Sequence, residues 1–344
     1  MQVHGSVAGG YPTDDRRGAE SVGGIMTDGK RNWEGVLAIW KPAGWTSHDV
    51  VAKARRLLRE RRIGHTGTLD PAVTGVLPLC VGRATRLVEY LQEAPKTYRA
   101  KLRFGIATDS EDLSGEIIER KDASFLTEPA IREAVFSFVG EIDQIPPMVS
   151  AVKVDGKRLY ELARQGITVE RKARRVTIHR IDVDEVTTGT DEPEVTFTVA
   201  CSKGTYIRTL CVDIGRKLGV PAVMAELVRL ESAGISQEHC VTLEEIPGLI
   251  EKGEMDGKLL AADRLLTQLP STSAAEQESR YALQGKGIRT ERLRPVPDRQ
   301  GLWKLYRSDG VFLGLFSVDE TTEWIRPVKV FHPSEDQPHD SQSD

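Results

Sequence analysis

Strand-like and helix-like segments follow one another in an irregular order along this 344-residue chain, and few fold classes accept that order. Apolar or alternating runs typical of strands occur at 76–81, 98–104, 174–186, 193–201 and 223–231. Helical spacing of apolar residues occurs between them, at 83–91, 128–138 and 206–218. A parallel sheet would need strands and helices in regular alternation. We therefore predict an α+β fold with a mixed, mostly antiparallel sheet flanked by helices.

Changes in composition divide the chain into four parts. The first is rich in Gly, Ser, Asp and Arg and the last is acidic, so both are predicted to be disordered. Asp309-Gly310 between two strand-like runs indicates a hairpin in a small all-β, barrel-like domain. The predicted parts are an extension at 1–34, a main domain at 35–270 with a helical connector at about 243–269, a C-terminal domain at 279–332 and a tail at 333–344.

Several protein classes lack support in this sequence. No run of eighteen apolar residues could span a membrane, and no secretion signal is recognisable at the N-terminus. The four cysteines form no C-x-x-C pair, so we expect no metal site. Neither a G-x-x-x-x-G-K-[ST] nor a G-x-G-x-x-G motif occurs, so we expect no nucleotide cofactor. We expect a cytoplasmic protein with no obligate protein partner, present as a monomer.

The formal charge of −4 argues at face value against a nucleic-acid binder, but the charge is unevenly distributed. Residues 41–100 and 151–180 each carry a net charge of +6, whereas residues 105–146 carry −7. Two groups of cations are candidate contacts for RNA phosphates: Arg55, Arg59 and Arg62 on one face of a helix predicted to end at Gly64, and Arg171, Lys172, Arg174 and Arg175. Each group is equally consistent with a solvated charged face.

The loop at residues 64–71 presents a single carboxylate, Asp70, between glycines and a proline. Such a carboxylate acts as a nucleophile or an electrostatic stabiliser when a cation keeps it ionised. It is also a common turn residue. Arg208, near the predicted start of a helix, is a candidate partner, because a cation there needs an anion nearby. An ordinary surface ion pair is the alternative.

Two further side chains are candidates for contacts with a substrate. Tyr98 lies between Lys96 and Arg99, as on surfaces where bases stack on an aromatic ring; a plain core tyrosine is the alternative. His65 has no histidine partner at metal-binding spacing, so it is expected to fix the loop or contact substrate.

Five segments in order resemble the B-type tRNA pseudouridine synthases, bacterial enzymes that isomerise the T-loop uridine at tRNA position 55. The strongest is the run GHTGTLDPAVTGVLP at 64–78. The others are KP at 41–42, KTYR at 96–99, IPPMVSA at 145–151 and CSKGTYIRT at 201–209. The resemblance covers about 35–270, and more weakly the small RNA-binding (PUA-like) domain at 279–332. It implies the mixed sheet of that family.

The resemblance implies a role for each matching residue. Asp70 would be the catalytic aspartate, Arg208 its partner, and Tyr98 the residue that stacks on the target base and helps move its C5 proton. The implied substrate-binding residues are Lys41 below the motif, His65 against the displaced T-loop, Tyr206 beside Arg208, and Leu227 against the base. The family usually has Leu-Arg-Arg where this chain has Leu227-Val228-Arg229, which puts an auxiliary contact in doubt.

The implied activity is an isomerisation that needs no cofactor, with the tRNA T-arm as partner. The carboxylate could trap the detached sugar or abstract a ribose proton to give a glycal. A non-catalytic RNA-binding or tRNA-folding protein is the alternative function. A glycoside or nucleoside hydrolase would need a second carboxylate, for which the motifs offer no candidate.

Overall fold

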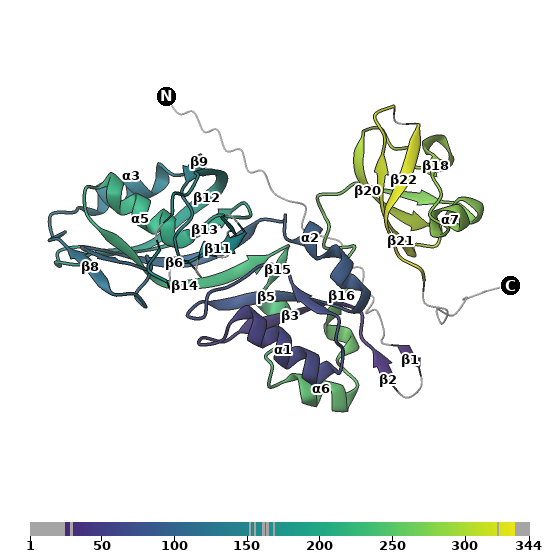
Figure 1. Ribbon diagram of the computed structural model, residues 1–344, viewed down its shortest axis with the longest axis horizontal. Helices are drawn as coiled ribbons and strands as arrows, with labels where there is room; N and C mark the ends of the chain where they lie inside the picture. The colour runs from purple at the N-terminus through teal and green to yellow at the C-terminus, as the bar shows by residue number, and fades with distance from the viewer. Residues whose placement is uncertain are drawn as a thin grey trace, which may run out of the picture.

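The chain folds into a large sheet domain and a smaller C-terminal domain (Figure 1). The computed structural model describes residues 25–27, 30–150, 153–154, 156–159, 162, 165–167, 169–321 and 323–333. Within them, no helix has the length and apolarity needed to cross a membrane.

The large sheet has ten strands, and its only parallel pairing among the described strands joins β5 to β14. In spatial order the strands are β16 (Leu259–Leu260), β3 (Gly35–Lys41), β5 (Thr74–Val81), β14 (Ala222–Ser232), β6 (Lys96–Phe104), β13 (Glu194–Cys201), β12 (Arg174–Thr187) and β9 (Gly140–Gln144). β4 (Ile63–His65) pairs with β5, and β15 (Ile235–Ser236) pairs with β14. The predicted mixed, mostly antiparallel sheet is confirmed.

Two separate hydrophobic cores lie on one face of this sheet. One contains Leu37 and Leu77 and is covered by α1 (Ser47–Leu58) and α6 (Ile246–Lys252). The other contains Leu102 and is covered by α3 (Glu128–Phe136) and α5 (Ile207–Lys217). Figure 1 shows these two pairs of helices over different parts of the sheet.

Tyr98 and Leu227 pack against both cores. Tyr98 pairs with Arg229 across β6 and β14, and Arg229 pairs with Gly75 of β5, so this cross-strand row joins the two halves. A side chain on Gly75 would overlap the backbone of Arg229, so only glycine permits the close approach of β5 and β14.

The opposite face of the sheet contacts the C-terminal domain. A core that includes Val36 and Cys80 of the sheet also includes Leu315 and Phe331 of that domain. The 3₁₀ turn η1 (Gly82–Leu87) and α2 (Val88–Leu91) occupy this region, in place of the single helix predicted at 83–91. Arg86 lies over the Phe331 ring, 5.0 Å from its centroid.

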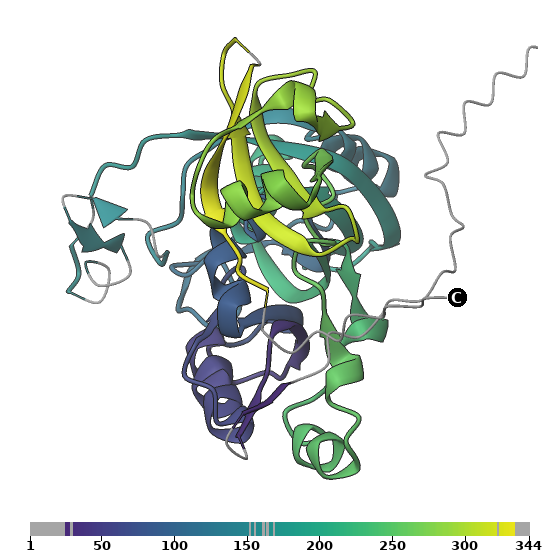
Figure 2. The ribbon, with the colours of Figure 1, turned by 90° about the vertical axis from the view of Figure 1, so that its right-hand side faces the viewer.

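The C-terminal domain is a six-stranded, barrel-like sheet that lies in front of the main domain in Figure 2. The predicted hairpin at Asp309-Gly310 is confirmed. In spatial order the strands are β18 (Ile288–Arg289), β22 (Trp324–Val330), β21 (Phe312–Val318), β20 (Gly301–Arg307), β17 (Ser271–Ala274) and β19 (Leu293–Arg294). The prediction of an all-β domain that starts at 279 is wrong, because β17 precedes that point and α7 (Glu276–Leu283) packs on the sheet.

The remaining described elements are short. They are the strand pairs β7 (Ile106–Thr108) with β8 (Ile117–Arg120) and β10 (Lys153–Val154) with β11 (Lys157–Arg158), and the 3₁₀ turns η2 (Gln237–His239), η3 (Asp256–Lys258) and η4 (Thr290–Arg292).

The predicted disorder of 1–34 is wrong for its last part. β1 (Ile25–Thr27) pairs with β2 (Lys30–Asn32), and the next residue, Trp33, is only 3% exposed in the core beside α1. Burial of a large aromatic ring stabilises order there. Residues 1–24 and 334–344, which hold the rest of the predicted extension and nearly all of the tail, lie outside the described residues.

Two predicted helices end earlier than expected. Thr46 caps α1, but the helix stops at Leu58 because Arg59 adopts a left-handed conformation (φ 52°) rather than continuing to Gly64. The helical connector at 243–269 is also wrong. α6 ends at Gly253, again in a left-handed conformation, and the chain then supplies β16 at the edge of the main sheet.

Candidate active site

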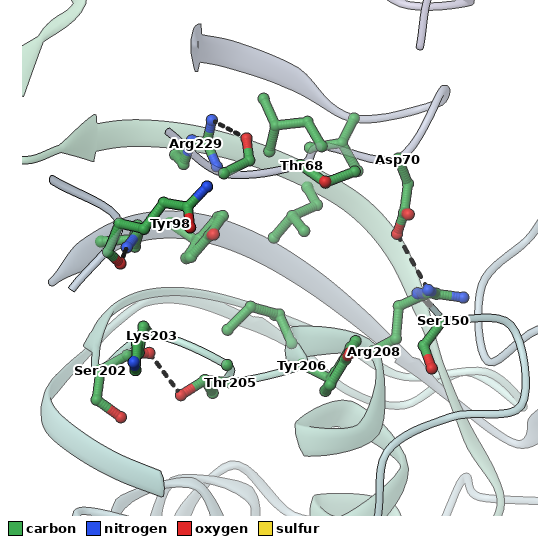
Figure 3. Close-up of a pocket in the computed structure, with 18 of the residues that line it drawn as sticks. Thr68, Asp70, Tyr98, Ser150, Ser202, Lys203, Thr205, Tyr206, Arg208 and Arg229 are labelled. Atoms are coloured by element: carbon green, nitrogen blue, oxygen red, sulfur yellow. Dashed lines mark hydrogen bonds and ion pairs between the residues drawn. The ribbon is translucent and has the colours of Figure 1, made fainter. Parts of the chain in front are cut away.

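A cavity of about 400 Å³ opens between the two cores, on the face that carries Tyr98 and Leu227 (Figure 3). Its walls come from the 66–70 loop, strands β6 and β14, and the turn between β13 and α5 at 202–206. Five residues that the sequence analysis selected line it together: Asp70, Tyr98, Tyr206, Arg208 and Leu227.

Asp70 and Arg208 form an ion pair at one end of this cavity (Figure 3). Oδ2 of Asp70 lies 3.1 Å from Nη2 of Arg208. The Asp70 side chain is 43% exposed, whereas that of Arg208 is only 6% exposed. A carboxylate held by a buried cation and open on its other side can reach a substrate.

Three groups besides Asp70 hold the Arg208 guanidinium in place. Nη1 donates to the backbone oxygen of Ser110, and Nη2 donates to that of Val149, each at 2.9 Å. Oδ2 of Asp112 lies 3.8 Å from Nη1. These contacts join the acidic 109–112 loop to the site, so the guanidinium has one orientation in which it can meet Asp70.

The loop that carries Asp70 is tied to the segment before α1. The Ser47 hydroxyl accepts from the Leu69 N–H at 2.8 Å. Lys41 has no exposed surface, and its ammonium donates to the backbone oxygens of Trp45 (2.6 Å), Pro42 (2.8 Å) and Pro71 (3.2 Å). Burial lowers the pKa of Lys41 to about 8, although the negative charge of Asp70 opposes that shift. Lys41 therefore supports the loop through its hydrogen bond to the Pro71 carbonyl, and it does not line the cavity.

Tyr98 and Leu227 belong to the apolar part of the cavity wall. Burial raises the pKa of the Tyr98 phenol, and the positive charge of Arg229 opposes this shift only in part. The hydroxyl is therefore protonated at neutral pH and able to donate a hydrogen bond. A planar ring beside an aliphatic side chain suits one face of a flat heterocycle.

Tyr206 is positioned through its backbone. Gln144, at the end of β9, accepts from the Tyr206 N–H at 2.8 Å and donates to its carbonyl at 3.0 Å. His65 lies outside the cavity lining, and its Nδ1 accepts from the Gly67 N–H at 3.3 Å. Burial lowers the pKa of His65. Among its described contacts, His65 thus stabilises the turn after β4.

The predicted phosphate-contacting residues differ in their surroundings. Arg55 donates to the Ile63 carbonyl at 2.8 Å, and Arg62 pairs with Glu60. Because α1 ends at Leu58, these side chains do not form one helical stripe.

In the second basic group, Arg171 donates to the Pro146 carbonyl and Arg175 pairs with Asp143 and Glu141. Three members of the two groups are exposed and form neither an ion pair nor a side-chain hydrogen bond with another described residue: Arg59, Lys172 and Arg174.

Comparison with known proteins identifies the family of this chain. The model of the TruB family pseudouridylate synthase N-terminal domain matches residues 55–207, and that of the tRNA pseudouridylate synthase B C-terminal domain matches 208–269. The tRNA pseudouridine synthase B of Clostridium perfringens is 41% identical over 288 residues, which are 83% of this chain and 95% of the relative. The chain belongs to the TruB family of pseudouridine synthases. Its TruB relative from Bacillus licheniformis is 50% identical over 240 residues, 69% of this chain and 78% of that protein.

Solved structures also show the TruB fold. One in a Cbf5–Nop10–Gar1 complex has a TM-score of 0.68 and 27% identity, and covers 87% of this chain and 85% of that chain. Another, in an archaeal box H/ACA sRNP Nop10–Cbf5 complex, has a TM-score of 0.66 and 27% identity, and covers 87% of this chain and 86% of that chain. The family recognised in the sequence is thus confirmed, and the chain is a pseudouridine synthase.

Among the cavity residues of this TruB chain that sequence reasoning did not select are two buried cations. Arg229 and Lys96 both line the cavity and are almost fully buried. The motif KTYR included Lys96, and the Leu227-Val228-Arg229 pattern included Arg229, but neither pattern says which face of its strand the cavity uses. Val228, which stands where the family usually has the first of the two arginines, is partly exposed and does not line the cavity.

Proposed function

We propose that this chain converts the T-loop uridine at position 55 of tRNA into pseudouridine, with Asp70 as the catalytic carboxylate. The observation that carries the proposal is the half-exposed Asp70 carboxylate, ion-paired with buried Arg208 and open to a cavity walled by Tyr98 and Leu227. The relatives named tRNA pseudouridine synthase B support tRNA as the substrate.

The chemistry requires one carboxylate and one base-sized cavity. The C1′–N1 bond of uridine breaks and its electron pair leaves with the uracil. The ring turns, C5 bonds to C1′, the proton on C5 is lost and N1 gains a proton. Asp70 either bonds to C1′ and is later displaced, or takes a ribose proton and returns it. Arg208 pairs with the carboxylate and orients it in both routes.

The target uridine must leave the stacked loop before it can enter the cavity, which costs a few kcal/mol. Stacking on Tyr98 recovers roughly 1–3 kcal/mol. Contacts to the folded RNA supply the remaining affinity. The exposed Arg59, Lys172 and Arg174 are proposed phosphate contacts, together with the more engaged Arg55, Arg62, Arg171 and Arg175.

The C-terminal domain at 271–332 is proposed to bind RNA as well. A second cavity there is lined by cations and aromatic rings. The Arg289 guanidinium lies 5.1 Å from the centroid of the Trp324 ring, and the Lys286 ammonium lies 5.4 Å from that of Tyr281. Rings beside cations suit unpaired bases and phosphates.

Mapping the product tests the proposed substrate. Unmodified tRNA transcript is incubated with the protein, and pseudouridine is located by carbodiimide adduct formation and reverse transcription. We expect one stop at position 55, and none when that uridine is replaced by cytidine. Conversion of other uridines at equal rates, or a stop outside the T-loop, would overturn the proposed position.

The salt dependence of binding tests the C-terminal contacts. Replacing Lys286 and Arg289 with Gln is expected to weaken tRNA binding at low salt and to reduce the slope of log Kd against log salt by roughly one to two. Arg280→Gln is the matched control, because Arg280 lies on α7 and is paired with Glu276. An unchanged slope in the double variant, measured by filter binding, would remove this surface from the proposed interface.

A further inference from the structure

The cavity has a second cationic end, separate from the Asp70–Arg208 pair. Arg229 is 1% exposed and Lys96 is 7% exposed, and both line the cavity. Neither forms an ion pair with a carboxylate of the described residues, whereas Arg208 pairs with two. Burial of an uncompensated charge is costly, so an arrangement of this kind is typical of a site that receives an anion or a strong acceptor.

Backbone carbonyls hold both cations without neutralising them. Nε of Arg229 donates to the Val76 carbonyl at 2.7 Å, and Nη2 donates to the Gly67 carbonyl at 3.2 Å. The Lys96 ammonium donates to the carbonyls of Gln92 (2.5 Å) and Ala94 (2.6 Å). Carbonyl dipoles orient the two side chains, but the positive charges remain.

The two cations lie close to each other, and both are close to Gly67. A Cβ built on Gly67 would lie 3.5 Å from Nη1 of Arg229 and 3.9 Å from Cε of Lys96. Burial, and then the charge of Arg229, lower the pKa of Lys96 to about 8. The adjacent Thr66 is fully buried and lines the same cavity, and its hydroxyl has no hydrogen-bond partner among the described residues.

The position of this pair matches the base, not the sugar. Arg229 is the cross-strand partner of Tyr98. Figure 3 shows Arg229 and Tyr98 on the side of the cavity away from Asp70 and Arg208. If C1′ lies at Asp70 and the uracil lies on Tyr98, the carbonyl oxygens of the base extend toward Arg229.

We propose that Arg229, with Lys96 beside it, binds a carbonyl oxygen of the target uracil and stabilises the negative charge of the base when it detaches. This inference rests on the proposed function of the same cavity. When the C1′–N1 bond breaks, its electron pair is shared by N1 and the two carbonyl oxygens of uracil. A buried guanidinium that is already in place stabilises that charge without reorganisation. N1 takes a proton only after C5 has replaced it on C1′.

If the bound oxygen is the one at C4, the same arrangement selects uracil over cytosine. Arg and Lys side chains are donors only. They donate to the carbonyl oxygen at C4 of uracil, but they would oppose the amino group at that position in cytosine. The unpaired buried donors then make cytosine entry unfavourable.

Sulfur substitution in the RNA, combined with Arg229→Gln, tests this contact. Single-turnover rates are measured with T-loop RNA that carries uridine, 2-thiouridine or 4-thiouridine at the target. Arg229→Gln is expected to lower the rate with uridine by about 10²-fold. For one of the two thio substrates, the ratio of uridine rate to thiouridine rate should be about tenfold larger in wild type than in the variant. Comparing the ratios cancels the intrinsic effect of sulfur.

The controls separate this contact from a structural role. Arg103→Gln removes an equal charge from β6, where Arg103 is paired with Glu194, and should keep the wild-type rate and ratios. Thermal unfolding and RNA affinity are measured for each variant, and Arg229→Lys replaces Arg229→Gln in the cycle if the latter does not fold. Equal ratios in wild type and variant for both thio substrates would overturn the proposal. That result, with normal product from wild type, would leave the proposed function standing.

Discussion

Asp70→Asn is expected to abolish pseudouridine formation while tRNA binding persists. Asn has the shape of Asp but no charge, so it can neither bond to C1′ nor take a ribose proton. The loop should keep its conformation, since the described contacts that position it use Lys41, Ser47 and backbone groups rather than the Asp70 carboxylate. We expect a loss of at least about 10⁴-fold in the single-turnover rate. Tritium release from 5-³H-uridine in tRNA measures it directly, because C5 loses its hydrogen.

Asp122→Asn is the matched control for this experiment. Asp122 is an exposed carboxylate whose described side-chain hydrogen bonds are with Ser124. The single-turnover rate of the Asp122→Asn variant should therefore equal that of wild type. Equal tritium release from Asp70→Asn and wild type would refute the catalytic assignment. Full biological activity of a product-free Asp70→Asn chain would favour the RNA-binding alternative as the role that the cell requires.

Arg208→Gln is expected to give the second largest loss, about 10²–10³-fold in the single-turnover rate, with tRNA affinity close to that of wild type. The substitution leaves Asp70 without its cation and removes the donors to the carbonyls of Ser110 and Val149. Arg208→Lys should recover part of the rate, because it restores the charge but not a planar group that can hold the carboxylate and two carbonyls together.

Arg216→Gln controls for loss of charge on the same helix. Arg216 lies on α5, is 74% exposed and pairs with Asp213. Its removal should change neither rate nor affinity by more than about twofold, as for most exposed pairs. If Arg208→Gln weakened tRNA binding and left the single-turnover rate intact, Arg208 would be a binding residue and not the partner that positions Asp70.

The sequence was informative where the site depends on local motifs. The run at 64–78 located the Asp70 loop, and the turn before α5 located Arg208 and Tyr206. Both are short segments whose glycines and capping positions set the backbone from nearby residues. The hairpin at Asp309-Gly310 and the strands of the main sheet were predictable for the same reason.

The end of α1 shows where local patterns failed. Apolar spacing and a run of arginines continue past Leu58, so the pattern predicted a longer helix. The helix ends where Arg59 turns left-handed and the chain returns as β4 along β5. Pairing with a strand from a later part of the chain outweighed helical propensity. The strand β16 at 259–260 was missed for the same reason, because two residues carry no pattern until β3 lies beside them.

The amino-acid sequence by itself determined the family, the order of the strands along the chain and the loop that presents one carboxylate. Only the tertiary structure decided that Asp70 and Arg208 meet, and that Arg229 and Lys96 face the same cavity without a described carboxylate partner. The physical reason is that alternation along a strand assigns residues to two faces, but it does not say which face is covered. On this sheet two cores cover one face and leave a gap between them, and the side chains at that gap form the site.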